Sequence, residues 1–279
     1  MTPQLLLIKR LATESTQFAK RVDPISSGIA ISLLQDAVEL YVWTTLKEKG
    51  LAVKDQSSFT ANLEALEKAG FAMPQVAKLL ELNKARVNFK HYGNLPAPGE
   101  AVKFETYAID CLTQAARDHF GIDFEQLSLV DLVAFPDVKA HLKAAETHIA
   151  ADELADAAKE ASIARGLLFG KLDKYLPHVD HNLKDTDRIL NSIEGVQGVN
   201  PFHYLTDYLD GVRQLVMLSL ARVPLETAIL FRNVLPPATQ FEAGNWRVRS
   251  QRAVHDKAHL TEVVRALVDI SSRIQELVR

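Results

Sequence analysis

Apolar residues recur along this chain at the three- and four-residue spacing that is typical of amphipathic helices. The clearest run follows Pro24 and predicts a helix from about 25 to Gly50, with an apolar face made of Ile29, Leu33, Leu34, Val38, Leu40 and Tyr41. The first twenty residues also predict a helix, because Lys9, Arg10 and Glu14 follow their apolar patch and no small-residue cleavage site does. The pattern predicts an all-α fold.

Capping residues and glycines bound three further helices in the first half of the chain. Serines precede a predicted helix at 57–70, Gly93 ends another at about 74–92, and Gly121 ends a third at 100–120. Together these helices predict an up-and-down helical bundle. A short apolar helix is expected at about 126–135, and the junction Phe135-Pro136-Asp137 predicts a boundary between domains 1–136 and 137–279.

The second half is predicted to be helical as well, with one small β-hairpin. An alanine-rich stretch at 140–176 is rich in strong helix formers and has room for one break. Further helices are expected at 203–222, 224–234 and 256–279, and a connection with one short helix at 185–194 fills residues 177–201. The only strand-like piece lies near 238–250, around Ala243-Gly244-Asn245.

Composition adds constraints on the class of protein. Hydrophobic residues make up 47% and charged residues 24%, a balance that predicts a folded globular chain. The single cysteine, Cys111, excludes an internal disulfide and a zinc site of several thiolates, and it favours a reducing compartment, so a cytoplasmic location is expected. No run of eighteen apolar residues exists, so no membrane span is expected.

A local basic patch stands out on a chain whose net charge is −3. Between Lys78 and Lys103 there are five lysines or arginines against two acidic residues. A polyanion such as RNA would be attracted to this segment and not to the protein as a whole.

The segment at 83–96, NKARVNFKHYGNLP, carries the best candidate chemistry. His91 can take a proton from a ribose 2′-hydroxyl, and Arg86 can offer forked donors to the phosphate oxygens, so neither a metal nor a cofactor is required. Five residues turn a helix by roughly 140°, so the two side chains do not share a face of a regular helix. We expect them to converge through unwinding next to Gly93 or through a symmetry-related copy. The candidates for RNA binding beside them are Lys84, Asn88, Lys90 and Tyr92.

At this point the chain resembles the HEPN superfamily of helical domains, over roughly residues 20–122. The resemblance rests on the apolar helix ISLLQDAVELYVWTTLKEKG, then a helix that ends in Arg, four residues, His, then a loop and a further amphipathic helix. It implies a bundle that forms a homodimer across the motif-bearing helices. It also implies a metal-independent endoribonuclease with Arg86 and His91 as the catalytic pair, an RNA substrate, and an antitoxin-like partner in a toxin–antitoxin or anti-phage system.

One position departs from the pattern of active members of that superfamily. Val87 stands where they usually carry a polar residue, and Asn88 follows one position later. Other members act without detectable catalysis. The alternative function is therefore a non-catalytic helical module for dimerisation or for protein or RNA binding.

Two histidine clusters are weaker candidates. His255 and His259, four residues apart around Asp256, could share a metal ion, but a third ligand is not evident and Asp256 is also a suitable helix cap. His178 and His181 lie in the polar loop PHVDHN, whose loop character alone explains them. No bound metal is therefore expected.

The remaining candidates concern ion pairing and stacking. Asp36 and Glu39 share the apolar helix and could pair with Arg86, either to hold the fold or to orient the arginine. Trp246 is followed closely in sequence by Arg247, Arg249 and Arg252. This set could bind single-stranded nucleic acid, or it could form the basic, solvated face of a strand. The sequence has no P-loop, dinucleotide glycine fingerprint or nucleophile elbow, so the common nucleotide-dependent classes lack support.

Overall fold

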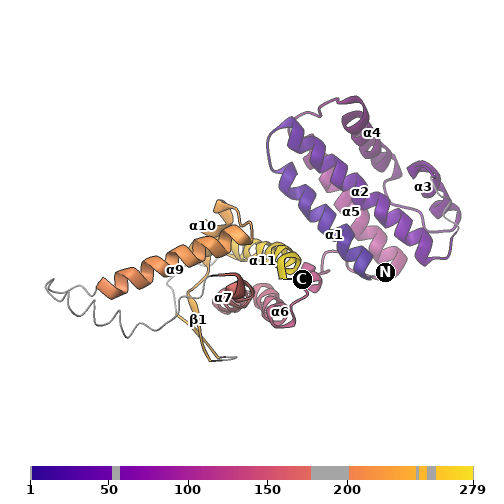
Figure 1. Cartoon of the computed structure of the whole chain (residues 1–279). Coiled ribbons are helices and arrows are strands. Elements are labelled where there is room, and N and C mark those ends of the chain that lie inside the picture. Colours follow the sequence, from indigo (N-terminus) through magenta and orange to yellow (C-terminus); the bar gives the residue numbers. More distant parts are fainter. Residues whose placement is uncertain (1, 52–56, 177–200, 243–244, 250–255, 279) are drawn as a thin grey trace. The chain divides into compact units, whose positions relative to one another are not determined.

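The computed structural model describes residues 2–51, 57–176, 201–242, 245–249 and 256–278. The chain forms two compact units, residues 1–129 and residues 130–279, which we call unit 1 and unit 2. Helices dominate both, and the strands of the described residues form one small antiparallel pair (Figure 1). The predicted fold class, all-α with one hairpin, is confirmed.

Unit 1 is a helical bundle built around α2 (Figure 1). Its helices are α1 (Thr2–Ala19), α2 (Pro24–Glu48), α3 (Phe59–Lys68), α4 (Val76–Tyr92) and α5 (Glu100–Phe120). The other four helices all pack against α2, which explains why large side chains such as Ile31, Leu34 and Tyr41 are fully buried on it. By length and composition α2 is the one helix of the described residues that could cross a membrane, and 61% of its most apolar window is buried inside the bundle.

Local sequence explains where these helices begin and end. The Asp23 carboxylate accepts a hydrogen bond of 2.8 Å from the N–H of Ser26, and Pro24 occupies the first turn of α2. The Ser58 hydroxyl accepts from the N–H of Ala61 at the start of α3. The predicted glycine stop after α5 is confirmed, because Gly121 adopts the left-handed conformation there with φ of +67°.

Unit 2 packs α6 (Pro136–Ala150), α7 (Leu154–Gly170) and α11 (Lys257–Val278) around one core, with α10 (Leu225–Val234) against α11. Two short 3-10 helices, η1 (Leu129–Leu132) and η2 (Asp173–Tyr175), and the longer α9 (Pro201–Leu220) complete its helices among the described residues. The alanine-rich stretch breaks once, at 151–153, so the predicted break is confirmed. The connection predicted at 177–201, with its short helix at 185–194, lies outside the described residues except for its last position.

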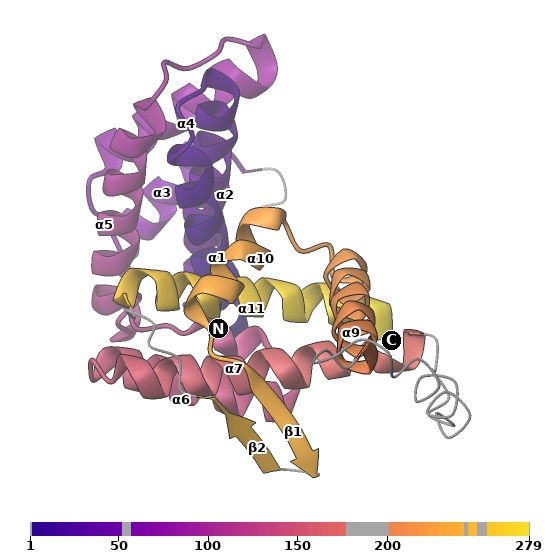
Figure 2. The same ribbon diagram turned by 90° about the vertical axis from the view of Figure 1, so that its left-hand side faces the viewer.

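The predicted hairpin is confirmed as β1 (Ala238–Glu242) paired with β2 (Asn245–Val248), beside α7 (Figure 2). Its register places Thr239 opposite Arg247 and Gln240 opposite Trp246. The Trp246 ring lies so close to Gly166 of α7 that a Cβ there would be 2.5 Å from it. The tryptophan therefore anchors the hairpin to α7.

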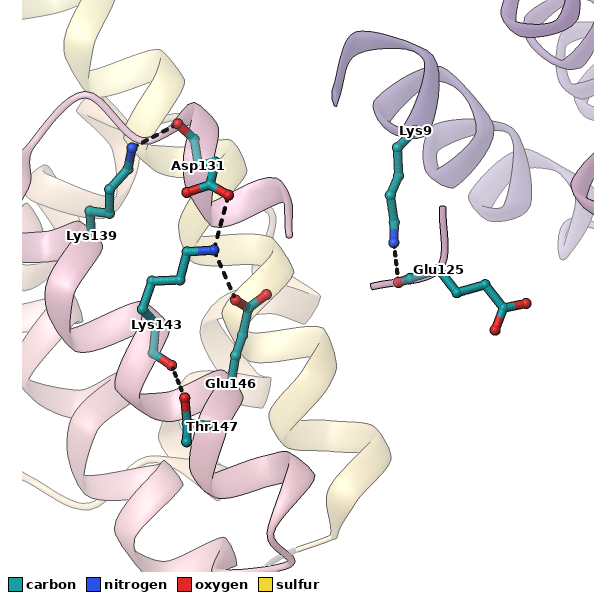
Figure 3. Close-up of polar contacts among 7 residues, drawn as sticks. All are labelled: Lys9, Glu125, Asp131, Lys139, Lys143, Glu146 and Thr147. Carbon is teal, nitrogen blue, oxygen red and sulfur yellow. Dashed lines mark hydrogen bonds and ion pairs between the residues drawn. The ribbon is translucent and has the colours of Figure 1, made fainter. Parts of the chain in front are cut away.

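The two units divide between Leu129 and Val130, a few residues before the Phe135-Pro136 junction suggested by sequence. Lysine side chains hold the segments on either side of this division to the unit in which each segment lies (Figure 3). Lys9 of α1 donates to the main-chain carbonyls of Phe124 and Glu125, which ties the end of unit 1 to its first helix. In unit 2, Lys139 donates to the Asp131 carbonyl at 2.8 Å and Lys143 to the Asp131 carboxylate at 3.0 Å, so η1 is held by α6.

Candidate functional site

The α4 helix carries the candidate residues, and one of its faces is turned toward α2. Leu79 and Leu82 are buried on this face, and Arg86 and Phe89 continue it at three- and four-residue spacing. The Phe89 ring lies against Gly28 of α2, where an added Cβ would be 2.3 Å from it. Arg86 therefore belongs to the packed side of the helix.

Arg86 is paired with α2, as one of the two sequence interpretations expected. Its Nη2 lies 3.5 Å from the Asp36 Oδ1, and its side chain keeps only 20% of its surface exposed. The Arg86 Nε is buried without a hydrogen-bond partner. The ion pair thus restrains the guanidinium while one donor stays unused.

A neighbouring polar contact that sequence reasoning missed joins the same two helices. Gln35 Nε2 donates to the Asn83 Oδ1 at 3.3 Å, and the Gln35 Oε1, like the Arg86 Nε, is buried without a partner. The sequence signal was available, since Gln35 and Asp36 interrupt an apolar run. Their partners on α4 could not be read from spacing alone.

His91 lies in the last turn of α4 and is exposed. The helix stays regular through Tyr92, and only then does Gly93 turn left-handed with φ of +68°. The N–H groups of Gly93 and Asn94 donate to the carbonyls of Phe89 and Asn88, at 3.2 and 3.1 Å. The helix end therefore does not unwind before Gly93 to bring His91 round to Arg86. Within the described part of the chain, no hydrogen bond or ion pair joins these two side chains.

The outward face of α4 brings other predicted residues together. Lys84, Asn88 and His91 stand at positions i, i+4 and i+7, which places them on one side of a helix over two turns. Lys84 and His91 are exposed and Asn88 is half-buried. We call this set the outer face of α4. Lys90 and Tyr92 are also exposed in the last turn, so this end of the helix presents cationic and aromatic groups to solvent.

A loop that follows this helix end is fixed by α2. The Ser27 hydroxyl donates to the Ala97 carbonyl and accepts from the N–H of Ala101, both at 3.2 Å. Glu100 accepts a further hydrogen bond from the N–H of Ala97 at 3.1 Å. The connection between α4 and α5 is therefore held close to the start of α2.

A second buried group, which the sequence interpretation did not single out, is His119 of α5. Its Nδ1 lies 3.1 Å from the Tyr41 hydroxyl and its Nε2 lies 3.3 Å from the Ala72 carbonyl. Burial lowers the pKa of His119 below its usual value, which favours the neutral imidazole. A neutral ring that donates to Ala72 and accepts from Tyr41 satisfies both contacts, so His119 serves the core of unit 1.

The remaining candidates have structural roles where the structure describes them. Cys111 is fully buried, and burial raises the pKa of its thiol to about 12, as expected of a core cysteine. The Asp256 carboxylate accepts from the N–H of Ala258 at 3.2 Å and lies 3.2 Å from the His259 Nδ1, as a helix cap does. Trp246 is occupied by its contact with Gly166. The candidates His178, His181, His255 and Arg252 lie outside the described residues.

Clusters of three or more histidine, cysteine or acidic side chains that could hold a metal ion do not occur among the described residues. The outer face of α4 is thus the described surface on which the most predicted site residues meet. Comparison of the chain with protein-family models, with curated proteins and with solved structures found no match.

Proposed function

We propose that unit 1 is a HEPN-like endoribonuclease module that binds RNA along the outer face of α4 and cleaves it as a homodimer without a metal ion. The observation that carries the proposal is the exposed His91 on the same face as Lys84 and Asn88. An exposed imidazole next to cationic and amide donors suits a phosphodiester backbone, because the donors neutralise phosphate while the imidazole exchanges protons.

The chemistry requires two proton transfers and one displacement at phosphorus. A neutral His91 takes the proton of a ribose 2′-hydroxyl, and the 2′-oxygen attacks the adjacent phosphorus. The bond from phosphorus to the 5′-oxygen breaks, and a protonated His91 from the second copy gives that oxygen its proton. The products carry a 2′,3′-cyclic phosphate and a 5′-hydroxyl. An arginine at the phosphate stabilises the charge of the transition state.

A second copy is needed because one chain keeps the two groups on different sides of α4. Arg86 is directed toward Asp36 on α2, and His91 is exposed roughly 140° further round the helix. Two copies that approach through the ends of α4 would place the His91 of one copy beside Lys84 and Asn88 of the other. The catalytic unit of this proposal is therefore the homodimer, as the resemblance also implies.

The decisive experiment is RNA cleavage in excess EDTA. We expect wild-type protein to cleave structured RNA and His91→Ala to lose at least about 100-fold in rate, the usual contribution of a general base. His259→Ala is the matched control, since it removes an exposed histidine from the other unit. Cleavage that survives His91→Ala, or that EDTA abolishes, contradicts the proposal.

The same substitution tests the proposed physiological setting, a toxin–antitoxin or anti-phage system with an antitoxin-like partner. Expression of the wild-type protein alone should arrest growth of the host cell, and His91→Ala should relieve the arrest at equal protein level. Equal growth with both proteins would contradict a toxin role.

A second candidate function is a non-catalytic module that binds RNA or protein through the same face. The contact between Arg86 and Asp36 favours it, because an arginine held by a carboxylate has a structural role already. This candidate predicts that RNA binding weakens in Lys84→Ala, that Arg86→Ala weakens self-association, and that no RNA is cleaved. A gel-shift series in rising salt, run beside the cleavage assay, separates the two functions.

A further inference from the structure

The α9 helix carries the largest group of exposed apolar side chains in the described part of the chain. The exposed fractions are 69% for Tyr208, 43% for Leu209, 39% for Val212, 66% for Leu215 and 40% for Val216. We call these five residues the α9 stripe. Single exposed apolar residues are ordinary on a protein surface, but a contiguous group along one helix marks an interaction surface.

The described residues in the rest of unit 2 do not cover this stripe. The helix packs closely against none of the other described elements, and Figure 1 shows it, in orange, extending away from α10 and α11. Among the described side chains of α9, Arg213 lies about 100° round the helix from Val212 and pairs with Asp173 at 2.9 Å. The α9 stripe is therefore apolar surface that the described residues leave open to solvent.

The stripe is symmetric about its own centre. Relative to Val212, its members stand at positions −4, −3, 0, +3 and +4. At about 100° per residue, all five lie within about 60° of Val212 around the helix. Within residues 208–216, the apolar positions have the same order in either direction along α9.

We propose that the α9 stripe is a self-association surface, on which the same helix of a second copy packs antiparallel about a two-fold axis at Val212. A two-fold interface must be self-complementary, and the symmetric spacing meets that condition. In this arrangement Tyr208 faces Val216 of the second copy, so a large side chain meets a small one. Leu209 faces Leu215, and the two copies of Val212 meet on the axis.

The size of the surface sets the strength of the association. Complete burial of the exposed parts of these five side chains, counted on both copies, removes at most about 1,000 Å² from solvent, near the lower limit of specific interfaces. The dimer should accordingly be reversible and depend on protein concentration. This surface lies in unit 2 and does not depend on the function proposed for unit 1.

Sedimentation velocity over a concentration series tests the proposal. We expect the average mass of wild-type protein to rise from 31.0 kDa with concentration, and Val212→Asp to reach at most half the mass of the wild type at the highest concentration, because it loses the contact through α9 whether or not unit 1 also associates. The matched control is Gln214→Asp, which places the same charge about 200° round the helix from Val212. Circular dichroism checks that both variants keep their helices.

Disulfide trapping then locates the contact. Val212→Cys should give a covalent dimer when diamide takes up the two electrons and two protons released as two thiols form one disulfide, because the two copies of residue 212 lie on the axis. Gln214→Cys should not. The native Cys111 does not interfere, since it is fully buried and its thiol pKa is raised to about 12.

Three outcomes would overturn the proposal. One is a wild-type protein that stays monomeric at all concentrations, as expected if another segment of the chain or a different partner covers the stripe. Another is a dimer that persists unchanged in Val212→Asp, as expected if the copies meet only through unit 1. The third is equal trapping by Val212→Cys and Gln214→Cys, which would indicate random collision.

Discussion

The helices α2 and α9 are similar in length and apolar character, but their surroundings are opposite. Both are apolar and at least 20 residues long. Four helices pack against α2 and bury it, whereas five large apolar side chains of α9 remain exposed. The comparison teaches that an apolar pattern specifies a helix with a surface to cover, and that chain topology or a second molecule decides what covers it.

The largest expected difference between the two helices is in the free energy of unfolding. Leu34→Ala removes a fully buried side chain from α2 and should cost unit 1 about 2–5 kcal/mol, through lost burial and the cavity left behind. Leu215→Ala removes a mostly exposed side chain from α9 and should change the stability of unit 2 by less than about 0.5 kcal/mol in dilute protein.

Urea denaturation followed by tryptophan fluorescence measures each unit separately. The chain has two tryptophans, Trp43 in unit 1 and Trp246 in unit 2. Leu34→Ala is therefore studied together with Trp246→Phe, and Leu215→Ala together with Trp43→Phe, each against its own parent. Equal losses for the two leucines would show that α9 is covered as fully as α2.

The glycines of the two helices give a smaller effect of opposite sign. A Cβ at Gly28 of α2 would overlap the Phe89 ring, so Gly28→Ala should destabilise unit 1 by about 1–3 kcal/mol. A Cβ at Gly211 of α9 would meet nothing within 4 Å, so Gly211→Ala should stabilise the helix by about 0.5–1 kcal/mol. The same fluorescence assay reads both, and a loss of stability in Gly211→Ala would indicate a neighbour on α9.

The core around α2 also predicts a pH dependence of stability. Burial lowers the pKa of His119, which contacts Tyr41 of α2, while an unfolded histidine titrates near 6.5. As the pH falls below about 6.5 the unfolded chain binds a proton that folded His119 does not, so unit 1 should lose stability until the folded pKa is reached. Above about pH 6.5 the contribution of neutral His119 to the stability of unit 1 is fully present.

Urea titrations of unit 1 at pH 7.5 and pH 5.5 measure the effect. Other histidines contribute to both wild-type protein and His119→Gln, so the informative quantity is the difference between their two pH slopes. His119→Gln should be less stable at pH 7.5 and should lose less stability on acidification. Parallel slopes would mean that folded His119 titrates as it does in the unfolded chain.

Sequence predicted the fold well where local signals decide it. Pro24, Ser58 and the glycines at 93 and 121 bound helices through their own backbone and capping preferences, so those ends were accurate to a few residues. The unit boundary fell several residues earlier than expected because Lys139 and Lys143 hold η1, and such a contact is set by tertiary packing.

The candidate site was predicted less completely, because it depends on which way side chains point. Spacing alone correctly separated Arg86 from His91 around the helix, and the ion pair with Asp36 was among the expected alternatives. The expected unwinding beside Gly93 did not occur before Tyr92. The contacts of Gln35 with Asn83 and of His119 with Tyr41 join helices far apart in sequence, and no single-helix pattern encodes them.

A small stability effect is expected at Asp36, and it bears most directly on function. The Asp36 side chain is 42% exposed and its oxygen lies 3.5 Å from Arg86, so Asp36→Asn should change the stability of unit 1 by less than about 1 kcal/mol. If Arg86 acts on RNA, loss of its restraint should reduce the cleavage rate by far more than that stability change reduces the folded fraction.

Glu39→Gln on the same helix is the matched control, since Glu39 has no ion pair among the described residues. Cleavage and urea stability measured on one preparation of each variant separate a positioning role for Asp36 from a structural one. Equal cleavage by Asp36→Asn, Glu39→Gln and the wild type would leave the ion pair with a packing role alone.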